Sequence, residues 1–454
     1  MTTNPKIFKT YDIRGVYKKD LDQETAYQIG LIFADLIRQE SKKKKPEIVV
    51  GGDMRLSTPE LKKSLIRGLV SGGSKVLDIG MVSTPTLYFG VGHLNGDGGI
   101  MVSASHNPGE WNGFKLTREK AKPVSFDTGI DLIKKKIENK EFKKAGEEGS
   151  FKKIEGILKA QIDHDFSFFD SNNIKPLKIV ADPANGMGAQ FLEAMFKNLN
   201  CELVKMNFEL DGTFPAHEAD PLKPENMEDL KERVKQEGAD LGIAIDGDGD
   251  RVFFVDSRGE AIDQSIIRGI LAKIFLKERP GSKICYDIRP GKITEDMIRE
   301  NGGTPIITRV GHSLIKEKTL KEKAYFAGES SGHFFLNMEI GCFEVPVIII
   351  GKLLEEFSQN NKKTADYIDP FKKYYHSGEI NSEVRDKNQV FQALEESNPK
   401  GKINKLDGIT IEYPDFWFNV RGSNTEEKVR LNLEARDKKT MEEKRDEVLK
   451  IIRS

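Results

Sequence analysis

The chain has 454 residues, about three times the length of an ordinary domain, so we expect three or four domains. Hydrophobic residues make up 37% and charged residues 31%, a composition that excludes extensive disorder. Lys and Arg number 71 against 72 for Asp and Glu, so the formal net charge is −1. This balance excludes a global field for nucleic acid or anionic membrane, and any anion must be bound by a local pocket.

The cysteines and the N-terminus indicate the compartment. Cys201, Cys285 and Cys342 lie far apart and form no CxxC pair, which argues against a disulfide framework or a Cys-rich zinc site. The N-terminus lacks the apolar core of a signal peptide, and no apolar run reaches the roughly 18 residues that span a bilayer. We therefore expect a soluble, cytoplasmic protein with no membrane or nucleic-acid partner.

Short apolar runs typical of β-strands recur along the chain. They cover residues 47–51, 75–80, 99–102, 177–181, 241–246, 252–256, 283–287 and 305–308. Amphipathic segments between them predict helices, one beginning near Thr58 and continuing to Val70, another with an apolar stripe from Ile266 to Phe275. This alternation predicts mixed α/β domains with largely parallel sheets.

Changes in composition divide the chain. The charged, Gly-containing segment 143–153 predicts a linker, a second change follows the strand at 252–256, and a third lies near 359–363 or shortly after. Beyond Ser377 the sequence becomes β-rich and ends in a Lys/Glu-rich helix, which predicts a smaller α+β domain. We therefore expect α/β domains at 1–150, 151–256 and 257–366, and an α+β domain at 367–454.

The strongest local signal is the sequence DGDGDR, which begins at Asp246. Asp246, Asp248 and Asp250 can turn inward onto one hard cation, and the glycines between them permit positive φ angles. A helix–loop–helix calcium site would need Gly at the sixth position and Glu at the twelfth, where this chain has Arg251 and Ser257. A plain hairpin turn is an alternative, although three alternating carboxylates would repel one another there. We favour Mg²⁺, which tolerates few carboxylates and keeps positions for phosphate oxygen and water.

A second signal, SASHNP, follows the predicted strand at 99–102. Ser105 lies at a strand-to-loop transition, a suitable place for a nucleophile or a phosphate carrier. A polar turn closed by Asn-Pro fits the same residues. A Ser–His–Asp hydrolase is disfavoured because no G-x-S-x-G surrounds Ser105. His106, adjacent in sequence, is not expected to face the Ser105 hydroxyl.

Two further loops carry polar groups suited to a phosphosugar. The sequence RGSNT offers backbone amides and the side chains of Arg421, Ser423, Asn424 and Thr425 as a phosphate cradle, with an ordinary Ser/Asn turn as the alternative. The chain contains neither a G-x-x-x-x-G-K-[ST] loop nor a dinucleotide-binding glycine pattern. ATP-driven transfer and nicotinamide redox chemistry are therefore disfavoured.

The loop GESSGH supplies groups for sugar hydroxyls. Glu329 and Ser331 offer paired acceptors and donors, and His333 can shuttle a proton. His312, in the sequence GHS, adds another imidazole. Each lone histidine is more often structural than catalytic, but three of the seven histidines lie in these Gly/Ser loops.

Together these segments describe phosphoryl transfer on a phosphosugar, and the chain resembles the α-D-phosphohexomutase superfamily, specifically its phosphomannomutase/phosphoglucomutase group. The motifs occur in the order YDIRG (11–15), SASHNP (103–108), NGFK (112–115), DGDGDR (246–251), GHS (311–313), GESSGH (328–333) and RGSNT (421–425). The resemblance implies four domains around a central cleft: three related mixed α/β domains and a smaller C-terminal α+β domain.

The resemblance also implies roles for individual residues. Ser105 would carry the phosphoryl group, and one Mg²⁺ per chain would be held by Asp246, Asp248, Asp250 and the phosphorylated serine. The transferring group would lie beside Arg14 and Arg251, and the candidates for acid–base chemistry are Lys115, His312 and His333. Glu329 and Ser331 would read the sugar 3- and 4-hydroxyls. The non-reacting phosphate would be bound by Tyr11, Arg421, Ser423, Asn424 and Thr425, and by Arg289, which stands where related mutases often have Lys.

The implied reaction interconverts hexose 6-phosphate and hexose 1-phosphate through a phosphoserine and a hexose 1,6-bisphosphate, which also acts as activator. The YDIRG opening favours mannose, or mannose and glucose, and the expected partner is a small phosphosugar bound by a monomer or weak dimer. A phosphoglucosamine mutase, a Mg²⁺-dependent sugar-phosphate phosphatase and a catalytically silent phosphosugar-binding protein remain as alternatives.

Overall fold

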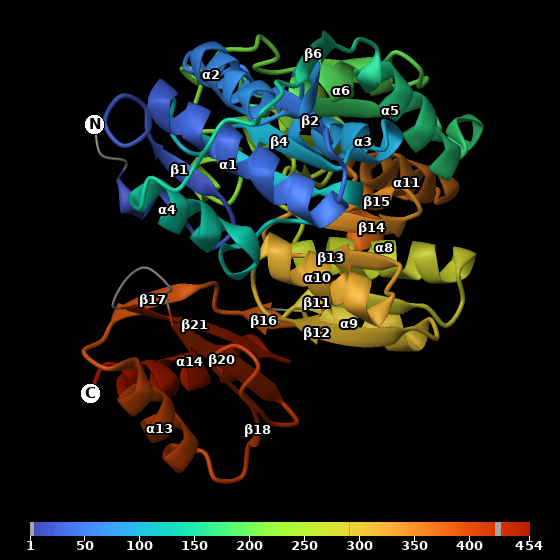
Figure 1. Cartoon of the computed structure of the whole chain (residues 1–454). Helices are drawn as coiled ribbons and strands as arrows, with labels where there is room; N and C mark the ends of the chain where they lie inside the picture. The colour runs from blue at the N-terminus through green and yellow to red at the C-terminus, as the bar shows by residue number, and fades with distance from the viewer. Residues whose placement is uncertain (1–3, 290, 423–427) are drawn as a thin grey trace. The chain divides into compact units, whose positions relative to one another are not determined.

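The computed structural model describes residues 4–289, 291–422 and 428–454 (Figure 1). The chain divides into two units. The first contains residues 1–262, 319–326 and 331–367, and the second contains residues 263–318, 327–330 and 368–454. α10 (His312–Glu322) and β13 (Phe326–Gly328) are shared between the two units.

The first unit begins with a six-stranded sheet of order β1-β5-β4-β2-β3-β6. The strands are β1 (Ile13–Val16), β2 (Glu47–Gly52), β3 (Lys75–Met81), β4 (Gly98–Val102), β5 (Trp111–Arg118) and β6 (Ser150–Lys153). β4, β2, β3 and β6 run parallel, and β5 is antiparallel to β4 and β1. The helices are α1 (Gln23–Ser41), α2 (Thr58–Ser71), α3 (Thr84–His93) and α4 (Asp131–Glu138). The apolar faces of α1, α2 and α4 bury a continuous core with strands of this sheet, including Phe33 and Phe114.

α1 and α2 pack in close backbone contact. A Cβ at Gly30 would lie 2.4 Å from the carbonyl oxygen of Leu65, and one at Gly68 would lie 2.1 Å from that of Tyr27. Only glycine therefore allows this spacing of the two helices.

The segment predicted as a linker, 143–153, differs from expectation at its end. β6 forms there and pairs in parallel with β3, so these residues extend the first sheet. The backbone N–H of Gly149 donates to the Val70 carbonyl at 2.8 Å and guides the chain into this edge position. β6 is stabilised by backbone pairing and contains no apolar run, so its sequence does not resemble that of a typical strand.

The remainder of the first unit holds a second sheet of order β10-β9-β7-β8. Its strands are β7 (Lys178–Asp182), β8 (Glu202–Lys205), β9 (Leu241–Ile245) and β10 (Val252–Val255), and β10 is antiparallel to β9. Helices α5 (Ile157–Asp165), α6 (Gly188–Phe196), α7 (Glu228–Glu237) and α11 (Pro346–Gln359) also belong to this unit. So does an antiparallel pair, β14 (Phe334–Met338) and β15 (Gly341–Glu344).

The second unit contains a parallel pair and an antiparallel sheet. β11 (Lys283–Asp287) pairs in parallel with β12 (Thr304–Thr308), accompanied by α8 (Gln264–Glu278) and α9 (Lys292–Glu300). The C-terminal sheet has the order β16-β21-β20-β19-β18, and β17 also pairs with β21. These strands are β16 (Tyr375–His376), β17 (Ile380–Glu383), β18 (Lys402–Asn404), β19 (Ile409–Glu412), β20 (Phe416–Gly422) and β21 (Lys428–Ala435). β17, β19, β20 and β21 share a core with α13 (Lys387–Ser397) and α14 (Lys438–Ile452).

The predicted elements correspond closely to these strands and helices. All eight apolar runs form strands that begin and end within one residue of the prediction, and α2 begins at Thr58. The predicted α/β fold class with a C-terminal α+β domain is confirmed. None of the helices in the described part of the chain combines the length and hydropathy needed to cross a bilayer.

Candidate active site

Three buried carboxylates lie together in the loop between β9 and β10. Asp246, Asp248 and Asp250 are at most 3% exposed, and one oxygen of each lies within 4.8 Å of the others. The loop joins an antiparallel pair, so it is both a hairpin connection and an acidic cluster. The three aspartates therefore form a possible metal site.

Glycine is required at two positions of this loop for different structural reasons. Gly249 has a φ of +83°, a left-handed conformation that disfavours other residues. A Cβ at Gly247 would lie 2.5 Å from the carbonyl oxygen of Ser105, because the two loops meet backbone to backbone. The glycines thus shape the loop and let it approach the serine loop.

Ser105 lies on the loop after β4 and is 1% exposed. Its hydroxyl donates a hydrogen bond to Oδ2 of Asp246 at 2.9 Å. Its backbone N–H donates to Oγ of Ser103 at 2.9 Å, and its φ of +53° is left-handed. The structure therefore brings the predicted phosphate carrier into direct contact with the predicted metal loop.

The orientation of His106 corrects the sequence-based expectation. Its Nδ1 lies 3.3 Å from Oγ of Ser105, so the prediction that it would not face its neighbour's hydroxyl is wrong. The left-handed conformation of Ser105 turns the two side chains toward each other. Burial and the charges of Arg251 and Arg14 hold the pKa of His106 well below its ordinary value, which favours the neutral imidazole.

Lys115, on β5, bridges two of the aspartates. Its Nζ donates to Oδ2 of Asp248 at 2.6 Å and to Oδ2 of Asp250 at 2.5 Å. Burial opposes the charge of Lys115, but the attraction of Asp248 and Asp250 prevails and holds its pKa well above its ordinary value.

The charges of the acidic loop are not evenly balanced. Burial, together with repulsion from Asp250 and Asp248, raises the pKa of Asp246 well above its ordinary value. Asp250 shows the opposite direction: burial disfavours its charge, but Lys115 and His333 lower its pKa well below the ordinary value. Asp246 is thus the carboxylate that most lacks a compensating cation.

Two arginines predicted at the site lie near the serine loop. Arg14, on β1, donates to the Ala104 carbonyl at 3.2 Å and to Oδ1 of Asn107 at 2.8 Å. Arg251 lies 3.9 Å from Oδ2 of Asp246 through Nε, and 3.6 Å from Asp220 through Nη1. Both predicted guanidinium groups are thus adjacent to Ser105 or its aspartate partner.

Sequence reasoning missed Arg55, whose side chain bonds to the backbone of the serine loop. Arg55 is 1% exposed, and its guanidinium donates to the carbonyl oxygens of Ser105 at 2.7 Å and Pro108 at 2.6 Å. Asp53 pairs with it at 3.2 Å. The sequence signal was a charged pair, D-M-R, directly after the apolar strand β2.

His333 joins the acidic loop from a third segment of the first unit. Its Nε2 lies 3.2 Å from Oδ1 of Asp250, and its Nδ1 lies 3.0 Å from Oγ of Ser331. Glu344, at the end of β15, is 1% exposed and offers an oxygen within 4.8 Å of ligand atoms of Asp250 and His333. Glu344 was not predicted, because no motif surrounds it.

The predicted sugar-reading residue Glu329 lies in the second unit. Its Oε1 accepts a hydrogen bond from the Gly311 backbone N–H at 2.7 Å and lies 3.5 Å from Nη2 of Arg289. Nε of Arg289 donates to Oδ2 of Asp287 at 2.5 Å. The next residue after Gly311, His312, is half-buried and begins α10.

The phosphate-cradle residues are only partly described. Arg421, at the end of β20, is 8% exposed and donates to Oε2 of Glu379 at 2.5 Å, while Arg430 lies 3.4 Å from the other oxygen of Glu379. Burial disfavours the charge of Glu379, but these arginines lower its pKa. Tyr11 is half-buried in the first unit. Ser423, Asn424 and Thr425 lie outside the described residues.

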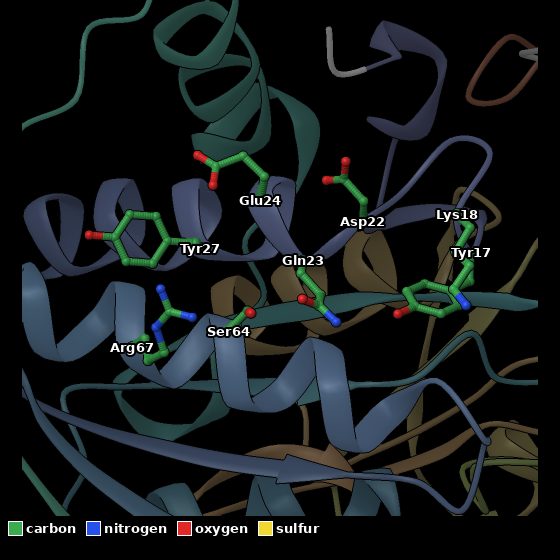
Figure 2. Close-up of a pocket in the computed structure, with 8 residues that line it drawn as sticks. All are labelled: Tyr17, Lys18, Asp22, Gln23, Glu24, Tyr27, Ser64 and Arg67. Atoms are coloured by element: carbon green, nitrogen blue, oxygen red, sulfur yellow. The ribbon is translucent and has the colours of Figure 1, made fainter. Parts of the chain in front are cut away.

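A cavity of about 410 Å³ beside α1 and α2 contains none of the predicted site residues (Figure 2). Two tyrosines line it, each with a cation over its ring: Arg67 lies 5.6 Å from Tyr27, and Lys18 lies 5.5 Å from Tyr17. Tyr17 also donates to Glu60. Both tyrosine rings of this cavity are thus already in contact with side chains of the protein.

Comparisons with known proteins agree along the whole chain. Models described as phosphoglucomutase/phosphomannomutase alpha/beta/alpha domains I, II and III match residues 5–144, 158–259 and 263–374, and the C-terminal domain model of the same family matches residues 379–451. A phosphomannomutase of Methanocaldococcus jannaschii is 40% identical over 98% of this chain and 97% of its own. A phosphomannomutase of Escherichia coli K12 is 38% identical over 94% of each chain.

A solved structure gives the same result. The crystal structure of a phosphoglucomutase/phosphomannomutase family protein from Burkholderia thailandensis matches with a TM-score of 0.90 and 31% identity, covering 99% of this chain and 97% of that one. These comparisons do not favour a phosphatase or a phosphoglucosamine mutase. The chain therefore belongs to the phosphoglucomutase/phosphomannomutase family of the α-D-phosphohexomutase superfamily and is a phosphohexose mutase, an intramolecular phosphotransferase.

Proposed function

We propose that this mutase interconverts hexose 6-phosphate and hexose 1-phosphate, with mannose or both mannose and glucose as the sugar, through a phosphoserine at Ser105. The observation that carries the proposal is the 2.9 Å hydrogen bond from the Ser105 hydroxyl to the Asp246 carboxylate. The names of the relatives, phosphomannomutases at 38–40% identity, support mannose. We further propose that the enzyme is cytoplasmic and acts as a monomer or weak dimer.

The acidic loop fits one Mg²⁺ per chain. Its donors are all carboxylate oxygens, which a hard divalent cation prefers. Oδ1 of Asp248 accepts no hydrogen bond from any residue in the described ranges. The pKa of Asp246 is raised by burial and by repulsion from Asp250 and Asp248, and a bound cation would relieve that repulsion. Asp246, Asp248, Asp250 and the phosphate on Ser105 would hold the ion. When bound, the ion would neutralise charge on the transferring phosphoryl group.

The transfer itself exchanges one ester bond for another. A free sugar hydroxyl attacks the phosphorus, the bond from phosphorus to Oγ of Ser105 breaks, and the hydroxyl proton passes to a base. His333 is our candidate for that base. Lys115, whose pKa is held well above its ordinary value, stays protonated at neutral pH and therefore suits stabilisation of negative charge. Arg14 and Arg251 supply further positive charge beside the equatorial oxygens.

The bound bisphosphate then turns over and returns its other phosphate to Ser105. We propose that Glu329 and Ser331 hold the 3- and 4-hydroxyls in both orientations. The non-reacting phosphate would be bound by Tyr11, Arg289, Arg421, Ser423, Asn424 and Thr425, and His312 stays a second candidate for proton transfer. Hexose 1,6-bisphosphate would act as activator because it phosphorylates any enzyme that has lost its phosphate.

The carrier role can be tested by mass and by activity. The intact protein should gain about 80 Da, the mass of HPO₃, after incubation with hexose 1,6-bisphosphate and Mg²⁺. Ser105→Ala should lose both this adduct and the conversion of mannose 1-phosphate followed by ³¹P NMR, whereas Ser41→Ala, at the end of α1, should keep both. Full mutase activity in Ser105→Ala would contradict the proposal. Release of inorganic phosphate without isomerisation would indicate a phosphatase.

A further inference from the structure

A fully buried arginine lies in the middle of an apolar helix of the second unit. Arg268 is on α8 and is 1% exposed, among neighbours such as Ile267, Ile270 and Leu271 that are also buried. A buried guanidinium is costly unless its charge is paired and its donors are satisfied. The apolar stripe of α8 alone does not explain an arginine at this position.

The partner of Arg268 is Asp287, the last residue of β11, which is completely buried. Oδ1 of Asp287 accepts from Nη1 of Arg268 at 2.5 Å, from the backbone N–H of Ser330 at 3.1 Å and from the Ser330 hydroxyl at 2.9 Å. Oδ2 accepts from Nε of Arg289 at 2.5 Å. One carboxylate thus joins a helix, the loop after β11 and the loop after β13.

Arg268 also contacts both of these loops directly. Its Nη1 donates to the Ser330 hydroxyl at 3.0 Å. A Cβ at Gly291 would lie 3.0 Å from Nη2 of Arg268, so the guanidinium packs against the backbone that leads into α9. We call Arg268, Asp287 and Ser330 the Asp287 cluster.

The Asp287 cluster borders two residues that the proposed function assigns to the substrate. Arg289 is bonded to Asp287 through Nε, and its Nη2 lies 3.5 Å from Oε1 of Glu329. Glu329 precedes Ser330 in the chain. Because Arg268 bonds to one oxygen of Asp287 and Arg289 to the other, the carboxylate holds the two guanidinium groups in place, and Nη2 of Arg289 faces Glu329.

We propose that Arg268 is a positioning residue for substrate binding: through Asp287 and Ser330 it fixes the orientations of Arg289 and Glu329 toward the sugar phosphate. The inference rests on the proposed function. It differs from a purely structural role, because a loss of positioning raises KM for the hexose phosphate while Ser105, which belongs to the first unit, keeps its ability to take up phosphate.

The test compares four variants. Arg268→Met removes the charge, Arg268→Lys keeps the charge but not the planar fork, and Ser330→Ala removes one hydroxyl from the Asp287 cluster. Arg299→Met, on the exposed face of α9, is the matched control. For each protein, kcat and KM are measured with mannose 1-phosphate and glucose 1-phosphate, together with the melting temperature and the phosphate adduct formed from hexose 1,6-bisphosphate.

We expect KM to rise on the order of tenfold or more in Arg268→Met and severalfold in Arg268→Lys and Ser330→Ala, with the phosphate adduct and the control unchanged. If Arg268→Met does not fold, the other two variants decide. An unchanged KM in folded variants, even with a lower melting temperature, would overturn the inference. An inactive wild-type enzyme that takes up no phosphate would instead overturn the proposed function.

Discussion

Asp246→Asn removes one charge from the acidic loop and keeps its shape. Oδ1 of Asp246 accepts from the backbone N–H groups of Asp250 at 3.0 Å and Arg251 at 3.1 Å, and Oδ2 accepts from the Ser105 hydroxyl. An asparagine carbonyl oxygen can keep the first two bonds, and its amide nitrogen can donate to the serine oxygen. The main effect of the substitution is therefore electrostatic.

The expected gain in stability follows from the spacing of the carboxylates. Two unit charges 4.8 Å apart, the upper limit for the ligand oxygens here, repel by roughly 3 kcal/mol at an effective dielectric constant of about 20. Lys115, bonded to Asp248 and Asp250, offsets part of this repulsion. We therefore expect the free energy of unfolding of Asp246→Asn to exceed that of the wild type by about 1–2 kcal/mol in the absence of divalent cations.

Urea unfolding at pH 7.5, followed by circular dichroism in EDTA and in Mg²⁺, measures this difference. The wild type should gain stability from Mg²⁺ because the ion binds only the folded loop, and Asp246→Asn should gain less. The variant should also lose mutase activity, since the proposed Mg²⁺ site loses one of its carboxylate ligands. Asp163→Asn, on the exposed face of α5, should match the wild type throughout. A variant less stable than the wild type in EDTA, with an unchanged m-value, would refute the argument that repulsion dominates this loop.

Three further substitutions test other contacts. Gly247→Ala should lower kcat at least tenfold and destabilise the protein by about 1–3 kcal/mol, because its Cβ would meet the Ser105 carbonyl; wild-type kinetics would show that the loops can separate freely. Gly68→Ala should lower the melting temperature by pushing α1 from α2 and leave KM unchanged, and an unaltered melting curve would contradict the packing argument. The pair of His376 and Asp263, 2.6 Å apart, raises the pKa of His376 and lowers that of Asp263. Its contribution to stability should therefore be present between about pH 4 and 6.5, diminish as the pH rises through the folded-state pKa of the histidine, and be absent in His376→Gln at every pH of a thermal-melt series.

Local signals in the sequence were sufficient for most of the secondary structure. The strand before the acidic loop, β9, is an apolar run of five buried residues, and such a run needs no knowledge of its neighbours to be recognised. β6 shows the opposite case. All four of its residues are exposed, and it forms because the edge of β3 offers backbone partners, which the sequence does not display.

In the candidate site, too, the residues with a local sequence signal were predicted and those that depend on distant segments were not. Alternating aspartates and glycines predict a cation loop wherever they occur, and Ser105 follows a buried strand that fixes its position. His106 was predicted to point away from the Ser105 hydroxyl, because an ordinary backbone separates adjacent side chains. The left-handed φ of Ser105, a non-glycine residue, reverses that expectation. The serine loop also approaches Gly247 of a distant segment backbone to backbone, and neither feature can be read from a single segment.

Arg55 and Arg268 escaped prediction because the groups that they contact lie far along the chain. Each arginine lies in or beside an apolar segment, and the local sequence, including the pair of Arg55 with Asp53, does not indicate the distant contact. Arg268 finds Asp287 nineteen positions along the chain, and Arg55 finds the Ser105 carbonyl fifty positions along. A buried arginine is nevertheless informative, because an unpaired guanidinium would destabilise the domain that contains it. A single Arg inside a helix as apolar as α8 therefore predicts a buried acidic partner, and in an enzyme the loops joined by that pair are the first place to look for substrate contacts.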